Sequence, residues 1–306
     1  MKPKFDLLAL GGVAVDDLLY AASYPPADEK AVVLCRERQC GGISAIALIT
    51  AARLGCACAY GGVLGQDELS DFAAAQMQAE GINLKHLSRR AEVRPIHSVI
   101  IIDTTCGSRN IFFDVNGVLG AAPDWPPAAV IESARVLFVD WFSIPGMIRA
   151  ARLARQAGIP TVGDFEQVPL PGLPVLLGLT DHLIVSESFA GKLTGAGEPR
   201  RALEKLWKKH HQLVAVTSGA KGCWYLSAEN PSLPRHQPAF KVKVVDTTGC
   251  GDVFHGAYAA ALAEGMNVPE RMRFAAAAAA LKATKPGAQK GIPTLAEVRK
   301  FLRLSL

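Results

Sequence analysis

One short stretch of the chain combines glycines with a carboxylate in a pattern that suits the handling of an anion. It reads Asp246-Thr247-Thr248-Gly249-Cys250-Gly251-Asp252, and an alanine-rich stretch of helical character follows it. The apolar run Val242–Val245 predicts a strand in front of the turn. The N–H groups of a glycine turn and the positive end of the helix dipole point toward one place, which predicts a phosphate site.

Asp252 is unusual in such a site, because a carboxylate repels an anion unless it takes up a proton. A base that removes the proton of a hydroxyl while a phosphoryl group arrives would be placed there. We therefore expect Asp252 to be the catalytic base. The N–H groups of Gly249, Cys250 and Gly251 are expected to stabilise the transferred group. A structural alternative is that Asp252 only caps the helix.

The composition is that of a globular protein and excludes several functions. Half of the 306 residues are hydrophobic and the formal charge is +5, with Lys208–His211 as the densest basic run. A solvated helix face explains that run better than a nucleic-acid contact does. Apolar stretches are interrupted, for example by Arg53 and Gln66, before they could span a bilayer. We expect neither a nucleic-acid partner nor a membrane partner.

The cysteines and the N-terminus indicate a compartment. Seven cysteines are scattered along the chain, and the pair Cys56 and Cys58 is too closely spaced for a zinc site. Free thiols in a reducing environment fit this pattern best. The chain runs from Met1 directly into the apolar run Phe5–Leu10, without the features of a signal peptide. The sequence therefore predicts a cytoplasmic protein.

The order of the predicted elements favours an α/β fold with a doubly wound, mostly parallel sheet. Phe5–Leu10 is the first predicted strand, and Asp16 and Asp17 come soon after its end, where ligands gather in such sheets. Asp164 lies just past another predicted strand and is a candidate for the substrate region. Further predicted strands of the large sheet are Val136–Val139, Leu183–Val185 and Val214–Thr217. Segments rich in Ile, Val and Phe read as a separate small sheet, over Lys30–Cys40, Pro95–Asp103 and Asn110–Val115.

The stretch that ends at Asp252 resembles the signature of the ribokinase-like (PfkB) carbohydrate kinases, Asp-Thr-x-Gly-Ala-Gly-Asp, with Cys250 in place of the alanine. Gly41–Gly55 resembles the N-terminal signature of the family, in which a diglycine opens a helix. Ile46 stands where many members carry a substrate-binding asparagine. Further similar segments are Gly61–Asp67, Val216–Gly222 and Lys285–Pro293. The resemblance implies one domain over residues 1–306, with the segments of a β-sheet lid at approximately 13–40 and 93–117.

The resemblance also implies a set of binding residues. Substrate contacts are expected from Asp16, Gly41 and Gly42, and from Lys30, which falls where the branch containing bacterial sulfofructose kinases has a lysine. Contacts to the nucleotide are expected from Ser186, Thr217, Gly219, Gly222, Thr247 and Gly287.

Two metal ions are expected on the same basis. The segment Ser186–Phe189 takes the place of an Asn-x-x-Glu pattern that supports magnesium, with Ser186 for the asparagine and Phe189 for the glutamate. Glu187 is then the nearest carboxylate that could act on Mg²⁺ through water. In many family members a monovalent cation such as K⁺ is held near the positions of Asp246 and Thr248.

The expected activity is transfer of the γ-phosphoryl group of ATP, with Mg²⁺ and possible use of K⁺, to a hydroxyl of a sugar. Phe113 and Phe142 occupy places where the sulfofructose kinase branch has polar or basic contacts, so a neutral, ketose-like sugar is expected. Two alternatives stay open: a nucleoside kinase of the same fold, and a catalytically weak sugar-binding regulator. The resemblance also makes a homodimer through the lid possible.

Overall fold

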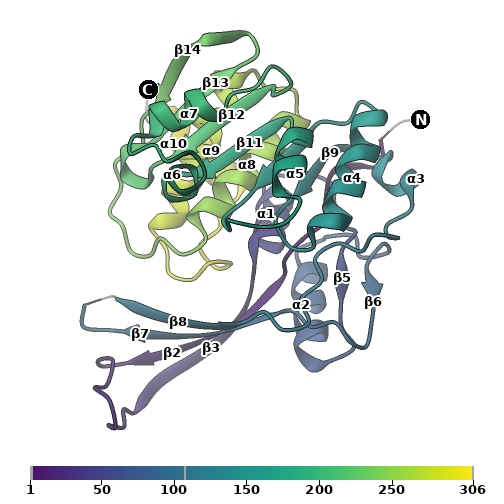
Figure 1. Cartoon of the computed structure of the whole chain (residues 1–306). Helices are drawn as coiled ribbons and strands as arrows, with labels where there is room; N and C mark the ends of the chain where they lie inside the picture. Colours follow the sequence, from purple (N-terminus) through teal and green to yellow (C-terminus); the bar gives the residue numbers. More distant parts are fainter. Residues whose placement is uncertain (1–2, 107, 305–306) are drawn as a thin grey trace.

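A central sheet of eight strands runs through the larger part of the molecule (Figure 1). The computed structural model describes residues 3–106 and 108–304. Six strands are parallel neighbours, and an antiparallel hairpin extends one edge. The strand order is β14 (Asn230–Gln237), β13 (Cys223–Ser227), β12 (Leu213–Thr217), β11 (His182–Ser186), β10 (Thr161–Asp164), β9 (Ala134–Val139), β1 (Phe5–Ala9) and β4 (Cys58–Tyr60).

Helices cover both faces of this sheet, because successive strand residues point to opposite faces and both sets are apolar. In β11, Ile184 packs into one core and its neighbours Leu183 and Val185 into the other. The first core is covered by α1 (Ile43–Arg53), α2 (Glu68–Ala79), α8 (Cys250–Ala263), α9 (Val268–Ala283) and α10 (Leu295–Leu304). The second is covered by α4 (Ile144–Gln156), α5 (Leu173–Leu179), α6 (Glu187–Thr194) and α7 (Pro199–Leu206), with the short α3 (Ala128–Ile131) nearby.

Small residues allow close packing of the helices beside the candidate site. A Cβ at Gly256 of α8 would collide with the backbone of Ala47 in α1. The alanine run of α9 lets that helix lie close along α8 in the same way. Helix α8 thereby packs closely against both α1 and α9.

A second sheet of four strands projects from this body (Figure 1). We call it the lid sheet. Its strand order is β3 (Val33–Gly41), β2 (Ala14–Ala21), β7 (Ile96–Asp103) and β8 (Arg109–Asp114). A small pair, β5 (Val63–Leu64) and β6 (Ser88–Arg89), lies apart from both sheets. The predicted fold class, a doubly wound and mostly parallel sheet with a small β-sheet lid, is confirmed.

One local prediction was wrong. Val242–Val245 is not a strand: it is irregular, and Val244 and Val245 are exposed. The N–H groups of Val245 and Asp246 both donate to the carbonyl of Ala283 at the end of α9. The segment therefore lies beside the C-terminal end of a helix and does not pair with a strand there. Asp16 and Asp17, which follow the first strand in the sequence, lie inside β2 of the lid sheet.

No helix in the part of the chain that the structure describes is long and apolar enough to cross a membrane.

Candidate active site

The glycine turn before α8 is held in place by Asp246. Its Oδ1 accepts hydrogen bonds from the backbone N–H (2.8 Å) and hydroxyl (2.7 Å) of Thr248, and its Oδ2 accepts from the N–H of Gly287 (2.8 Å). Gly249 has a φ of 74°, which a residue with a side chain rarely adopts, and α8 begins immediately after it. The N–H of Cys250 donates to the carbonyl of Thr247 (3.2 Å), whereas the N–H groups of Gly251 and Asp252 precede the first hydrogen bond within α8, from Val253 to Gly249, and are available to an anion.

Asp252 lies in the first turn of α8, next to other carboxylates. Burial raises the pKa of Asp252 well above its ordinary value, and the charges of Asp164, Glu166 and Asp16 raise it further, while His255 lowers it. A carboxylate with a raised pKa accepts a proton more readily than an ordinary aspartate does. The geometry therefore suits the base that the sequence predicts at this position.

His255 connects this cluster to the turn, a role that the sequence analysis missed. Its Nδ1 lies 2.9 Å from the carbonyl oxygen of Gly251 and 3.1 Å from Oδ2 of Asp164, and its Nε2 lies 3.0 Å from the carbonyl of Ile184. The contact to Gly251 follows from helical spacing, because the two residues are four apart. The contact to Asp164 brings together β10 and α8, which no local pattern indicates.

Asp16 reaches the same region from the lid sheet. It is 7% exposed, a Cβ at Gly41 would collide with its carboxylate, and its charge contributes to the raised pKa of Asp252. Burial raises the pKa of Asp16, and a hydrogen bond from Ser98 counteracts the rise. Asp17 points to the opposite face, where it pairs with Arg38 (2.7 Å) and His97 (2.8 Å).

Gln39 is a second polar group of the lid sheet near the site, and the sequence analysis did not identify it. It lies opposite Asp16 in the pairing of β2 with β3, and it is 3% exposed. Its Oε1 is buried without a hydrogen-bond partner among the described residues. An acceptor left in this state beside Asp16 is suited to a hydroxyl donor from outside the protein.

Asp140, after β9, is a further buried acid that the sequence analysis did not identify. It accepts hydrogen bonds from the N–H groups of Gly12 (2.6 Å) and Phe142 (2.8 Å) and from the hydroxyl of Ser44 (3.1 Å). Burial raises its pKa to about 7, and the three donors oppose that rise. Through these hydrogen bonds Asp140 connects the loop after β1 to the loop after β9.

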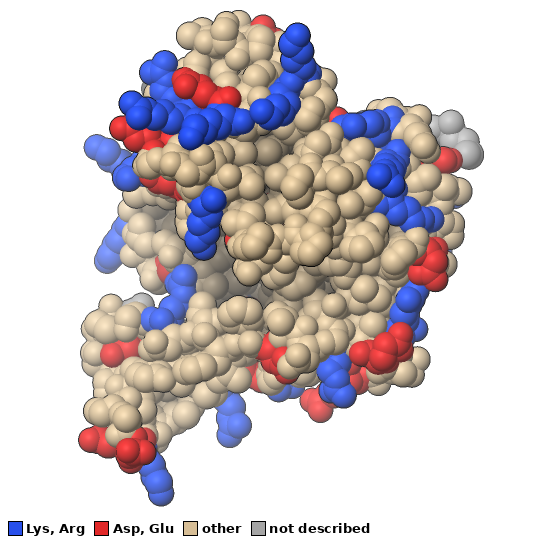
Figure 2. All heavy atoms as spheres, viewed as in Figure 1, with Lys and Arg blue, Asp and Glu red and all other residues tan. Residues whose placement is uncertain are grey.

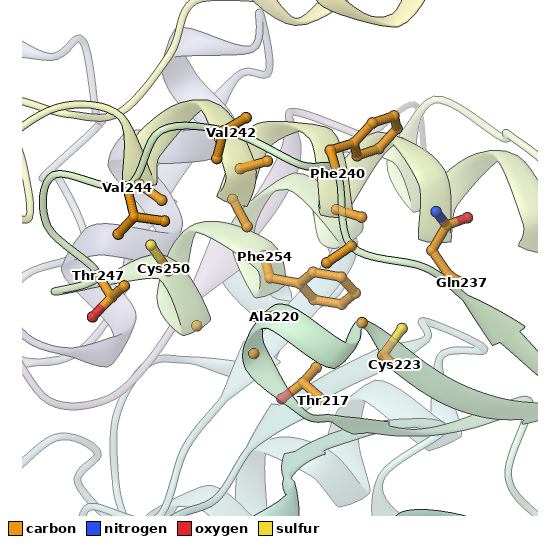
Figure 3. A pocket seen from close by; sticks show the side chains of 18 of the residues that line it. Thr217, Ala220, Cys223, Gln237, Phe240, Val242, Val244, Thr247, Cys250 and Phe254 are labelled. Carbon is orange, nitrogen blue, oxygen red and sulfur yellow. The ribbon is translucent and has the colours of Figure 1, made fainter. Parts of the chain in front are cut away.

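A cavity of about 590 Å³ adjoins the glycine turn, which contributes Thr247, Cys250 and Gly251 to its lining (Figure 3). In Figure 3 the ring of Phe254 lies in its middle, with Val242 and Val244 along one side and Thr217 and Ala220 along the other. Five of the six residues predicted to contact a nucleotide line this cavity: Ser186, Thr217, Gly219, Gly222 and Thr247. The sixth, Gly287, does not; it lies close to Gln39, and its N–H binds Asp246.

Other predicted residues lie apart from the cluster. Lys30 is exposed in the loop between β2 and β3, at the end of the lid sheet that points away from the body (Figure 1). Glu187 begins α6 and lies 3.9 Å from the ammonium of Lys221. Ser186 caps that helix by accepting from the N–H of Phe189, whose side chain is in the core.

Figure 2 shows a recess between the lid sheet and the body, with few charged side chains along its walls. Within residues 3–106 and 108–304, no cluster of three or more His, Cys, Asp or Glu side chains could hold a metal ion by itself. A metal at this site would need ligands from a bound nucleotide or from water.

The helix-covered parallel sheet, the lid sheet and the aspartate above a glycine turn define a ribokinase-like α/β kinase. Residues 8–295 match the model of the pfkB family carbohydrate kinases, and the chain belongs to this family. It is a carbohydrate kinase, a phosphotransferase.

Named relatives agree with this assignment. The ribokinase of Haemophilus influenzae is 28% identical over 308 residues, which cover 97% of this chain and 98% of that protein. The bifunctional ribokinase/ribose-5-phosphate isomerase A of Fructilactobacillus sanfranciscensis is 28% identical, and the match covers 94% of this chain but only 54% of that protein. The structure of Arabidopsis thaliana ribokinase complexed with ribose and ATP superimposes with a TM-score of 0.85 at 25% identity, and the match covers 99% of each chain.

Proposed function

We propose that the protein transfers the γ-phosphoryl group of ATP to a hydroxyl of a neutral sugar, with Asp252 as the general base. The observation that carries the proposal is the position of Asp252. It lies in the first turn of α8, directly after Cys250 and Gly251, which line the cavity together with Thr217 and Thr247, and its buried carboxylate is subject to the charges of Asp164 and Asp16. A phosphoryl group held at the turn would face a hydroxyl held at Asp16 across this residue.

The residues of the site have separate roles in the proposed reaction. Asp252 takes the proton of the sugar hydroxyl as its oxygen bonds to the γ-phosphorus and the bond to the β-phosphate oxygen breaks. The N–H groups of Gly249, Cys250 and Gly251 stabilise charge on the transferred group. His255 is a positioning residue, because it fixes Asp164 and the carbonyl of Gly251 relative to each other.

The cavity suits a nucleotide. Apolar side chains such as Val242, Val244 and Phe254 offer contacts to a base, and Thr217 and Thr247 add hydroxyl-bearing side chains to the lining. The Arabidopsis relative was solved with ATP, which favours ATP as the donor.

The donor set of the site also fits Mg²⁺, which neutralises charge on the phosphates when it is bound. We propose that Asp164 and Glu166 hold its water shell in preference to Glu187, because both act electrostatically on Asp252 while Glu187 faces Lys221. The Mg²⁺ concentration required for half-maximal rate should rise in Glu166→Gln and stay unchanged in Glu187→Gln. The reverse result would favour the role that the sequence predicted for Glu187.

We propose a pentose as the substrate, in place of the ketose that the sequence suggested. Relatives named ribokinase, one of them solved with ribose, support this choice. Asp16 and the unpartnered Gln39 offer acceptors to sugar hydroxyls, and Gly41, where a Cβ would collide with the Asp16 carboxylate, leaves room for that side chain. Ile46 and Phe142 are buried and apolar, so the sugar is expected to be held by fewer side-chain hydrogen bonds on that side.

We also propose a cytoplasmic homodimer. The seven cysteines are all free, which suits a reducing compartment.

Phe112 is exposed on the face of the lid sheet that carries Asp17, opposite Asp16, and could meet a second copy there. Analytical ultracentrifugation of the protein and of Phe112→Ser tests the dimer: the wild type should sediment as a dimer and the variant as a monomer.

ADP release from MgATP across pentoses, ketoses, aldoses and nucleosides tests the proposed function, with Asp252→Asn as the control. Turnover of a pentose that disappears in the variant supports the proposal. Turnover of a nucleoside alone would identify the nucleoside kinase alternative. Stabilisation by a sugar without any ADP release would identify a sugar-binding regulator.

A further inference from the structure

A lysine ammonium is buried behind the glycine turn. Lys282, on α9, is 0% exposed, and its Nζ donates a hydrogen bond of 2.9 Å to the backbone carbonyl of Asp246. The same Nζ lies 3.9 Å from Oδ2 of Asp246. Lysine is almost never buried in this way without a partner that needs its charge.

The sequence led us to expect a monovalent cation at Asp246 and Thr248, but the residues present do not fit one. The carbonyl of Asp246 accepts from Lys282, and both carboxylate oxygens of Asp246 accept from N–H or hydroxyl donors of Thr248 and Gly287. The guanidinium of Arg109 adds positive charge 3.3 Å from Oδ1. A cation bound to the same oxygens would lie against the ammonium, and like charges at that distance repel strongly away from bulk water.

The loop after α9 leaves room for the lysine. Gly291 has no side chain, and a Cβ there would lie 3.0 Å from Cε of Lys282 and 3.1 Å from the carbonyl oxygen of Gly287. A larger residue at position 291 would crowd the lysine side chain. The lysine therefore passes between the loop that contains Gly287 and the loop that contains Asp246, and it reaches oxygen atoms that a free ion would otherwise bind.

We propose that the ammonium of Lys282 takes the place of a monovalent cation in this kinase, so that neither folding nor catalysis requires K⁺. The side chain acts as a covalently attached cation that holds the Asp246 loop in position. Because Asp246 in turn binds Thr248 and Gly287, Lys282 supports the turn that presents Gly249 and Gly251 to the phosphates. It is a positioning residue, since it acts through Asp246.

The carboxylates of Asp246 and Asp252 favour the protonated form of Lys282, whereas burial and Arg109 oppose it. Burial is the larger effect, so the pKa of Lys282 lies below its ordinary value. The hydrogen bond to a carbonyl uses one of the three donors of the charged form.

Thermal unfolding without sugar or nucleotide tests the proposal independently of the substrate. The wild type should melt at the same temperature in potassium chloride as in choline chloride of equal ionic strength. Lys282→Ala opens space beside the freed carbonyl of Asp246, so it should melt lower in choline chloride and recover part of the loss in potassium or ammonium chloride. Lys282→Met fills that space with an apolar group and should not recover.

Lys285→Ala is the matched control, since that exposed lysine on the same loop pairs with Glu297 at the surface. It should show no response to K⁺. Once a substrate is known, the rate of ADP release by the wild type should differ by less than about twofold between potassium chloride and choline chloride. For Lys282→Ala, the rate in potassium chloride should be about tenfold or more above the rate in choline chloride.

A wild type that K⁺ stabilises or activates strongly would overturn the proposal. So would a Lys282→Ala variant that is as stable and as fast as the wild type without K⁺. If Lys282→Ala does not fold, the comparison of the two salts on the wild type decides the question by itself.

Discussion

At the scale of single residues, the site is a group of acids that cannot all be ionised together. Burial raises the pKa of Asp252, Asp164 and Glu166, and repulsion by neighbouring carboxylates raises the pKa of Asp252 and of Asp164 further. Such a group binds protons readily, and one member placed at a helix N-terminus is suited to accept the proton of an incoming hydroxyl. The partial positive charge at the N-terminus of α8 favours the ionised form of Asp252. His255 lowers the pKa of Asp252 and of Glu166.

The role of Asp252 leads to the first prediction. Asp252→Asn should lower kcat about 100-fold or more, because the amide cannot accept the proton. Binding of ATP should persist, since the cavity is lined by other residues, and ATP should still raise the melting temperature of the variant. A variant with near-normal kcat would leave Asp252 only the structural role of a helix cap.

Asp140 leads to the second prediction, which concerns stability against pH. Its pKa is about 7 in the folded protein, whereas an unfolded aspartate has a pKa of about 4. In this window the folded state holds a proton that the unfolded state has lost. The stabilising contribution is therefore complete below about pH 4 and is lost as the pH rises through about 7.

Asp140→Asn should flatten this dependence in urea unfolding measured across the window. It should also cost about 1–3 kcal/mol, because one of the N–H groups of Gly12 and Phe142 loses its acceptor. Asp71→Asn, which changes a largely exposed carboxylate, is the control. An unchanged slope in Asp140→Asn would show that another group titrates.

At the scale of elements, α9 shows how a run of small residues serves two purposes. On one side its alanines pack closely in the core with α8, and on another side Ala276, Ala279 and Ala280 line the nucleotide cavity. An Asn267–Glu270 capping box begins the helix, so its start does not depend on the ligand. The helix is thus a fixed wall whose small side chains leave space.

The third prediction fills that space. Ala280→Leu should raise the KM for ATP about tenfold, because overfilling a packed site costs on the order of 1–3 kcal/mol. The KM for the sugar should change little. Asn267→Ala is the control on the same helix: it should lower stability by about 1 kcal/mol and leave the KM for ATP unchanged. Equal effects of both changes on the KM for ATP would place the nucleotide elsewhere.

At the scale of the whole molecule, the lid sheet is connected to the body by ion pairs next to the site. Arg109 of β8 lies 3.3 Å from Asp246, and Glu37 of β3 lies 2.8 Å from Lys290. Both partners in the body belong to loops that surround the glycine turn. These ion pairs therefore contribute to the position of the lid sheet over the substrate recess, together with the hydrogen bond from the N–H of Cys40 to Gln289.

The fourth prediction concerns these contacts. Exposed ion pairs contribute about 0–1 kcal/mol, so Glu37→Gln should leave the melting temperature nearly unchanged. The KM for the sugar should rise about two- to fivefold, because a small free-energy change in lid position acts directly on binding. Added salt should remove the difference between the variant and the wild type. Arg90→Gln, which breaks the pair with Asp124 outside the lid sheet, should not change the KM.

The sequence by itself determined what depends on neighbours along the chain. The glycine turn with Asp252, the alternation of strands and helices, and the separate small sheet follow from local backbone requirements and from hydrophobic periodicity. It was wrong at Val242–Val245, because a β-branched run also fits an exposed segment beside a helix. Asp17 and Asp16 are indistinguishable by residue type; the family resemblance selected Asp16, and the pairing of β2 in the lid sheet puts the two side chains on opposite faces.

Only the tertiary structure decided the contacts between distant residues. His255 meets Asp164, Asp140 meets Gly12, and Lys282 meets Asp246 because strand ends and loops that are far apart in sequence converge at one edge of the sheet. No pattern along the chain specifies such a pair. A buried charge or an unpartnered acceptor is visible only when everything that surrounds it has been placed.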